Sequence, residues 1–402
     1  MMITSSTPAR RMFATVLVAA AAALTGAFVA SGPAGARPAG APPPGSGYVA
    51  LGDSYAAGYG IGTSTGRPVA GCAQSTQDYP HQIAAALKLR LTDVSCTGAV
   101  TANIDTTRQV TDAGTAALQD TALRKTTKLV TVTIGGNDLG FGDIAKYCLA
   151  VTASGPLVLH PTELNCKAHY APAGGTDSLA ERIANVVVPR VARVLAAIHT
   201  KAPNAKVYFI DYPAISTTQA GSPDPATYPN SCFSPVAVPN SFPFTGVDTV
   251  YLQAVQANLN AALSARVAKS GDAFVEAYPQ SLPHSACAGT AQPWMNGVTF
   301  DLQTQSSAPG SLHPNLIGAT KLAGAALAAI GPYSAPPAPP PTSSPARPAT
   351  HTVHVVSATS RTLANSGPSN AGPLTLSGLL LVLAGSGLLL AARRRPESAS
   401  RR

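Results

Sequence analysis

Four residues, Ser54, Gly98, Asn137 and His313, are of the types that acyl transfer needs. That reaction requires a nucleophile, a base that takes its proton, and N–H donors that stabilise the negatively charged oxygen of the tetrahedral intermediate. Ser54 and His313 can supply the first two. The backbone amides of Ser54 and Gly98 and the side-chain amide of Asn137 can supply the donors. The simpler alternative for Ser54 is a strand end followed by a helix cap.

Three of these residues directly follow segments that we predict to be strands. Ser54 follows the apolar run 48–51, Gly98 follows 90–95, and Asn137 follows 128–134, which is dense in β-branched residues. We predict further strands at 206–212 and 273–277, and helices at 79–89, 178–198 (with a kink or break at Pro189), 249–269 and 316–330. Strands that alternate with helices indicate one domain with a parallel sheet covered on both faces. Ligands bind such sheets at the carboxyl ends of the strands.

The order of the motifs resembles that of the SGNH/GDSL hydrolase family, especially its secreted actinobacterial lipases and esterases, over roughly residues 47–331. The matching motifs are Gly-Asp-Ser at 52–54, Cys-Thr-Gly-Ala at 96–99, Gly-Gly-Asn-Asp at 135–138 and His-Pro-Asn at 313–315. The resemblance implies a three-layer α/β/α sandwich with a flavodoxin-like parallel sheet. It also implies that Ser54 is the nucleophile, His313 the base, and Ser54, Gly98 and Asn137 the oxyanion hole.

The function that the resemblance implies is cleavage of carboxylic esters through an acyl-enzyme, as in a lipase, an esterase or an A-type phospholipase, without metal or cofactor. Two alternatives stay open. One is an O-acetyl esterase that acts on a polysaccharide. The other is a surface-binding module that kept the fold and lost catalysis.

The sequence departs from the family pattern at Gly310. The family commonly has an aspartate three residues before the histidine, where it orients the imidazole; some members use a main-chain carbonyl at that position instead. We therefore expect the carbonyl of Gly310 to orient His313, which gives a Ser–His dyad. The alternative is that Asp301 reaches in from its loop.

Both ends of the chain differ in composition from the middle. Residues 1–36 have the paired Arg10-Arg11, an apolar run and small residues typical of a signal peptide, with the Sec and Tat routes both open. We predict a flexible lead-in at 37–46, a hydrolase domain at 47–332, a Pro/Ser/Thr/Ala-rich linker at 333–372, a transmembrane helix at 373–392 and a basic cytoplasmic tail at 393–402.

The segment Leu-Ala-Asn-Ser-Gly at 363–367 is similar to a sortase sorting signal. The alternative is that the apolar segment after it is a simple stop-transfer anchor. Either arrangement places the enzyme outside the cell, attached to the membrane or the cell wall.

Charge and cysteine usage restrict the partners and the compartment. Ten of the 27 Lys/Arg and one of the 18 Asp/Glu lie outside residues 45–332, which leaves 17 of each in the domain and no reason to expect nucleic acid. The six cysteines favour disulfides in an exported chain, and no Cys-x-x-Cys pair indicates zinc. Fifteen pairings are allowed; we predict the sequential one, Cys72–Cys96, Cys148–Cys166 and Cys232–Cys287, in a monomer.

Overall fold

The computed structural model describes residues 40–216, 232–287 and 292–334, all of which lie in the first of two compact units, Met1–Pro337. The predicted signal peptide, sorting motif, transmembrane segment and basic tail lie outside the described residues, as does nearly all of the predicted linker. Within the described residues one helical stretch, Ser178–Lys201, is long and apolar enough to cross a membrane. Its apolar side packs into the protein core, so its composition is that of a core helix.

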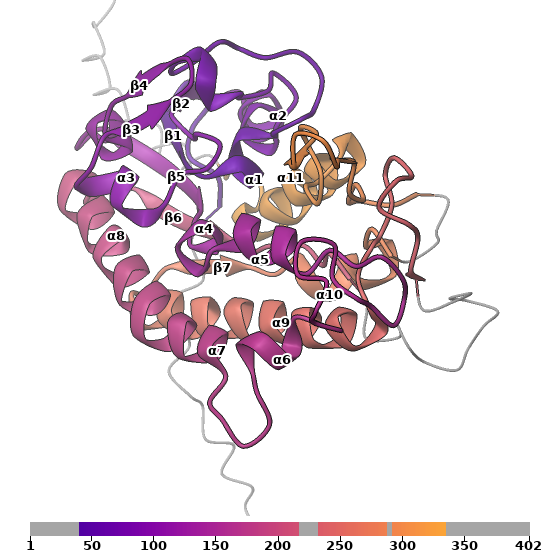
Figure 1. The fold of residues 1–402 in the computed structure, drawn as a ribbon. Coiled ribbons are helices and arrows are strands. Elements are labelled where there is room, and N and C mark those ends of the chain that lie inside the picture. The colour runs from indigo at the N-terminus through magenta and orange to yellow at the C-terminus, as the bar shows by residue number, and fades with distance from the viewer. Residues whose placement is uncertain (1–39, 217–231, 288–291, 335–402) are drawn as a thin grey trace, which may run out of the picture. The chain divides into compact units, whose positions relative to one another are not determined.

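A five-stranded parallel sheet forms the centre of the domain (Figure 1). Its strands, in spatial order, are β2 (Arg90–Asp93), β1 (Gly47–Gly52), β5 (Thr127–Thr133), β6 (Lys206–Ile210) and β7 (Ala273–Val275). Counted along the sheet-forming strands this order is 2-1-3-4-5, the flavodoxin-like order, in which the chain changes direction between the first and third strands. All five strands predicted from the sequence are confirmed.

The helices pack on both faces of the sheet and in the connections between strands (Figure 1). They are α1 (Ser54–Ala57), α2 (Tyr79–Leu87), α3 (Thr101–Asp105), α4 (Gly136–Leu139), α5 (Phe141–Tyr147), α6 (Lys167–Tyr170), α7 (Ser178–Arg182), α8 (Val188–Lys201), α9 (Gly246–Lys269), α10 (Tyr278–Ser281) and α11 (Leu316–Ile330). Short 3₁₀ turns are η1 (Ala70–Cys72), η2 (Gln119–Ala122) and η5 (Leu282–His284). Two small antiparallel pairs complete the described elements, β3 (Gln109–Thr111) with β4 (Gly114–Ala116) and β8 (Phe300–Asp301) with β9 (Ser306–Ser307).

The alternation of side chains along the strands produces the three layers. In β1, Tyr48 and Ala50 point to the face covered by α2 and α11, whereas Val49 and Leu51 point to the face covered by α8 and α9. Because both faces are covered, the strands are apolar on both sides, as parallel strands usually are. The predicted α/β/α sandwich is confirmed.

The long helix predicted over 178–198 is not broken at Pro189. A π-helical turn, η3 (Ile183–Val187), joins α7 to α8 directly before the proline. Proline lacks an N–H and removes one bond from the regular helical ladder. The helix therefore changes its hydrogen-bonding register over one wider turn and continues past Pro189.

All six cysteines lie within the described residues and all are paired. The disulfides are Cys72–Cys96, Cys148–Cys166 and Cys232–Cys287, the sequential pattern. The first of them joins the loop after α1 to the segment that carries Gly98.

Candidate active site

Ser54 lies where β1 ends and the short helix α1 begins. The side chain of Asp53 caps this helix by accepting the backbone N–H of Tyr55 at 2.9 Å. Gly52 has φ +141°, and a Cβ there would collide with the carbonyl oxygen of Thr133 in β5. Glycine therefore lets β1 turn tightly against its neighbour, and the cap turns Ser54 toward the carboxyl edge of the sheet.

His313 lies in the loop before α11, and its side chain meets that of Ser54. The distance from His313 Nε2 to Ser54 Oγ is 2.7 Å, and both residues are buried. The hydroxyl of Tyr55 donates to the carbonyl of Leu312 at 2.9 Å, and this hydrogen bond connects the loop that carries His313 to α1. A nucleophile and a base within hydrogen-bonding distance are the first requirement of general base catalysis.

The prediction that the Gly310 carbonyl orients His313 is wrong by one residue. His313 Nδ1 lies 2.7 Å from the carbonyl oxygen of Ser311. The Gly310 carbonyl instead accepts the backbone N–H of His313 at 3.1 Å and the side-chain amide of Asn296 at 3.1 Å. Leu312 has φ +56°, a left-handed conformation that tightens the loop and brings the nearer carbonyl under the ring. The partner of the imidazole is still a main-chain carbonyl.

Asp301, the alternative orienting group, does not reach His313. Its exposed carboxylate accepts the backbone N–H groups of Gln303 and Thr304 at 2.7 and 3.2 Å, so it caps the turn of its own loop.

The surroundings of His313 keep the imidazole neutral. Burial lowers the pKa of His313 to about 4, although the Ser311 carbonyl acts in the opposite direction. The rings of Tyr55, Tyr59 and Phe141 lie around the imidazole, with centroids 4.9 to 6.1 Å away. The carbonyl at Nδ1 accepts a hydrogen bond, so Nδ1 carries the proton and Nε2 has the lone pair that faces Ser54.

The predicted oxyanion donors come from three loops. Within the described chain, the backbone N–H groups of Ser54 and Gly98 have no protein acceptor. Gly98 follows the Cys72–Cys96 disulfide with φ +77°. Asn137 lies in α4 and shares a pocket with Ser54, and its amide nitrogen donates to the Ala99 carbonyl at 2.9 Å. That amide has a second hydrogen, which remains for an oxyanion.

Two polar side chains that the sequence interpretation missed hold these loops together. The hydroxyl of Tyr212 accepts the backbone N–H of Gly136 at 2.8 Å and donates to the Asp53 carboxylate at 2.6 Å. Asp138 accepts the backbone N–H and the hydroxyl of Thr101 at 2.8 and 2.6 Å. Tyr212 lies two residues after the end of β6, so the search for polar groups at strand ends that located Asn137 could also have located Tyr212.

An apolar pocket opens beside Ser54. Ser54 and Asn137 line it together with apolar side chains, many of them from α5 and α9, such as Phe141, Ile144, Leu252, Val255 and Leu259. A concave apolar space with a few polar groups at one end is typical of a small-molecule site, and this one suits a hydrocarbon chain attached to a reactive carbonyl.

Comparisons with known proteins identify the family of the chain. The sequence profile of the GDSL-like Lipase/Acylhydrolase family matches residues 50–321. The chain is 34% identical to Lipase 2 of Streptomyces coelicolor, over 79% of this chain and 96% of that protein, and 30% identical to Lipase 1 of the same organism, over 71% and 86%. Its fold is similar to the crystal structure of phospholipase A1 from Streptomyces albidoflavus NA297, with a TM-score of 0.53 and 26% identity over 71% of this chain and 98% of that one. The chain therefore belongs to the GDSL-like lipase/acylhydrolase family.

Proposed function

We propose that this protein hydrolyses long-chain acyl esters of lipids, as a lipase or an A-type phospholipase, with Ser54 as nucleophile and His313 as general base. Its family makes it a carboxylic ester hydrolase. The observation that supports the residue roles is the 2.7 Å distance between Ser54 Oγ and His313 Nε2, with Ser54 also lining an apolar pocket.

The proposed reaction has two halves. Ser54 Oγ attacks the ester carbonyl carbon while His313 Nε2 takes the hydroxyl proton, and the amides of Ser54, Gly98 and Asn137 stabilise the oxyanion. The tetrahedral intermediate then expels the alcohol, to which His313 returns the proton, leaving an acyl group on Ser54. In the second half His313 deprotonates water, which attacks the acyl carbonyl, and the proton returns to Ser54 as the carboxylic acid leaves.

The pocket favours lipid over acetylated glycan as the substrate. An acetyl group would contact little of the apolar lining beside Ser54, whereas a hydrocarbon chain would bury apolar surface against α5 and α9. An inactive binding module is disfavoured because it would not need the Ser54–His313 contact.

A chain-length series tests this function. We expect kcat/KM for p-nitrophenyl esters to rise from acetate to medium and long chains, and fatty acid to be released from phosphatidylcholine vesicles. Ser54→Ala serves as the blank. Highest activity on the acetyl ester or on acetylated xylan would reject the lipid assignment.

We further propose that the chain is exported and held at the outer surface by its C-terminal segment. Three disulfides support an oxidising compartment. The apolar stretch 373–392 followed by arginines supports an anchor. Mass analysis of the C-terminus of the surface-bound protein separates the alternatives: sortase cleavage would end the chain within 363–367, whereas a stop-transfer helix would leave Arg402 in place.

A further inference from the structure

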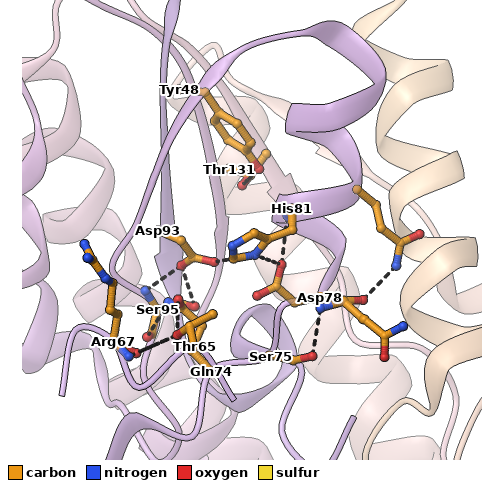
Figure 2. A network of polar contacts seen from close by, with 12 residues as sticks. Tyr48, Thr65, Arg67, Gln74, Ser75, Asp78, His81, Asp93, Ser95 and Thr131 are labelled. Carbon is orange, nitrogen blue, oxygen red and sulfur yellow. Dashed lines mark hydrogen bonds and ion pairs between the residues drawn. The ribbon is translucent and has the colours of Figure 1, made fainter. Parts of the chain in front are cut away.

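Three side chains outside the catalytic site, Asp78, His81 and Asp93, converge between α2 and β2 (Figure 2). Asp78 is the N-cap of α2, His81 is in its first turn, and Asp93 is the last residue of β2. None of the three lines the pocket beside Ser54.

The three groups are close enough to share one ion. His81 Nδ1 lies 2.7 Å from Asp78 Oδ1 and 3.9 Å from Asp93 Oδ2. One potential ligand atom from each residue lies within 4.8 Å of the others. Ligand atoms that surround a tetrahedral metal at about 2.0–2.2 Å lie about 3.3–3.6 Å apart, so His81 Nδ1 would exchange its hydrogen bond to Asp78 for the ion as the three side chains adjust.

The second carboxylate oxygens are an independent indication that a partner belongs here. Asp78 Oδ2 and Asp93 Oδ2 are both buried without a hydrogen-bond partner, and the side chains are 0% and 3% exposed. The other oxygens are in use: Asp78 Oδ1 accepts the backbone N–H of His81 at 2.8 Å, and Asp93 Oδ1 accepts the N–H and the hydroxyl of Ser95. Leaving a buried carboxylate oxygen unpaired is costly.

No Lys or Arg in the described chain lies within 4.0 Å of either carboxylate, so His81 is their only ionic partner there. Two adjacent buried carboxylates without a strong cation need either a proton or a metal ion.

We propose that Asp78, His81 and Asp93 form a binding site for a divalent transition-metal ion such as Zn²⁺. One imidazole nitrogen with two carboxylate oxygens suits zinc better than calcium, which prefers oxygen ligands alone. Water would complete the coordination, and the one-third exposure of the His81 side chain gives an ion access from solvent. The resemblance to the hydrolase family implied a reaction without metal, and an ion at this site is an addition to that expectation.

The site would stabilise the fold and take no part in ester cleavage. An ion there would join α2 to β2 beside α1, the helix that begins with Ser54. The two helices meet closely at Gly58, the C-cap of α1, because a Cβ on Gly58 would lie 2.8 Å from the Asp78 Cβ. Binding to the folded chain alone raises its stability by mass action.

The test is zinc binding by the full chain after chelator treatment and dialysis, measured by elemental analysis and thermal unfolding. We expect about one Zn²⁺ per chain, a midpoint of unfolding that rises by several degrees with Zn²⁺, and a smaller effect of Ca²⁺. His81→Ala should weaken zinc binding by about tenfold or more and remove the thermal shift. Asp93→Asn, which keeps an oxygen to accept from Ser95, should do the same.

His199→Ala is the matched control, because His199 pairs with one carboxylate, Asp272, at 3.0 Å and is 40% exposed. It should bind zinc as the wild type does. The proposal is overturned if wild type retains no zinc and shows no shift, or if His81→Ala matches wild type in both measurements.

Discussion

His313 and His81 each have an oxygen 2.7 Å from Nδ1, but the two oxygens differ in charge. The partner of His313 is the neutral carbonyl of Ser311, and the partner of His81 is the carboxylate of Asp78, with Asp93 nearby. The Asp78–His81 pair has the Asp–His arrangement of a catalytic triad, but it is His313 that contacts Ser54. With the proposed roles, the base is the histidine that contacts Ser54, and its orienting group needs only to accept a hydrogen bond.

The largest effect should come from removing either member of the dyad. Ser54→Ala and His313→Ala should each lower kcat by at least about 10⁴-fold, because each removes a group that the bond-making step requires. His81→Ala is the comparison and should keep ester turnover near wild type. Circular dichroism should show native folds, and substantial turnover by a folded dyad variant would contradict the assignment.

Removing one oxyanion donor should have a smaller effect. Asn137→Ala should lower kcat by about 10²–10³-fold, as expected for one preorganised donor. Asn204→Ala removes an exposed amide that donates to the Lys125 carbonyl, and it should leave kcat unchanged. Equal kcat for the two variants would exclude Asn137 from the oxyanion hole.

The pH dependence of kcat/KM tests whether His313, which has a neutral partner, has a lowered pKa. The folded pKa of His313 is depressed to about 4, so the base is neutral down to low pH. We therefore expect kcat/KM to fall only at a pH well below 6.5. For a histidine with its ordinary pKa of about 6.5, the neutral fraction would already be about 30-fold lower at pH 5. The same shift lowers stability as the pH falls from about 6.5 to about 4, because the unfolded chain takes up the proton first. A fall of kcat/KM with a midpoint near pH 6.5 would contradict a lowered pKa of His313.

A substitution at Gly310 should lower stability because of the backbone conformation at that position. Its φ is +80°, so Gly310→Ala forces a strained left-handed residue at a cost of about 1–2 kcal/mol in stability. Ser311→Ala keeps the orienting carbonyl and should retain most of kcat. Urea unfolding and initial rates check both, and a large loss of kcat in Ser311→Ala would show that its hydroxyl, which bonds to Thr299, also matters.

Asp301→Asn should have the smallest effect. The carboxylate is exposed and bonds only within its own turn, so kcat should stay within about tenfold of wild type, which is less than about 1.4 kcal/mol in the barrier. A third triad member would cost up to about 10⁴. A loss of several orders of magnitude would therefore restore Asp301 as the orienting group.

The sequence predicted the strands and the motif residues because both depend on local patterns. Apolar, β-branched runs identify strands, and the carboxyl ends of parallel strands meet at one edge, which brings Ser54 and Asn137 together. The Ser311 carbonyl was missed because the left-handed conformation of Leu312 decides which carbonyl lies under the ring, and no pattern specifies it. Asp93 was missed as a partner of His81 because only the tertiary fold brings β2 against α2.

The apolar pocket and the proposed reacting groups come largely from different parts of the fold. The proposed nucleophile and oxyanion donors lie in the segments that directly follow the sheet strands, whereas much of the apolar wall comes from α5, α9 and the side chains of Phe242 and Phe244. Substrate size and bond cleavage can therefore evolve or be engineered separately. Larger side chains at Val255 or Leu259 would shorten the accepted chain and leave the chemistry of a short ester intact, so one scaffold can give enzymes with different chain-length preferences.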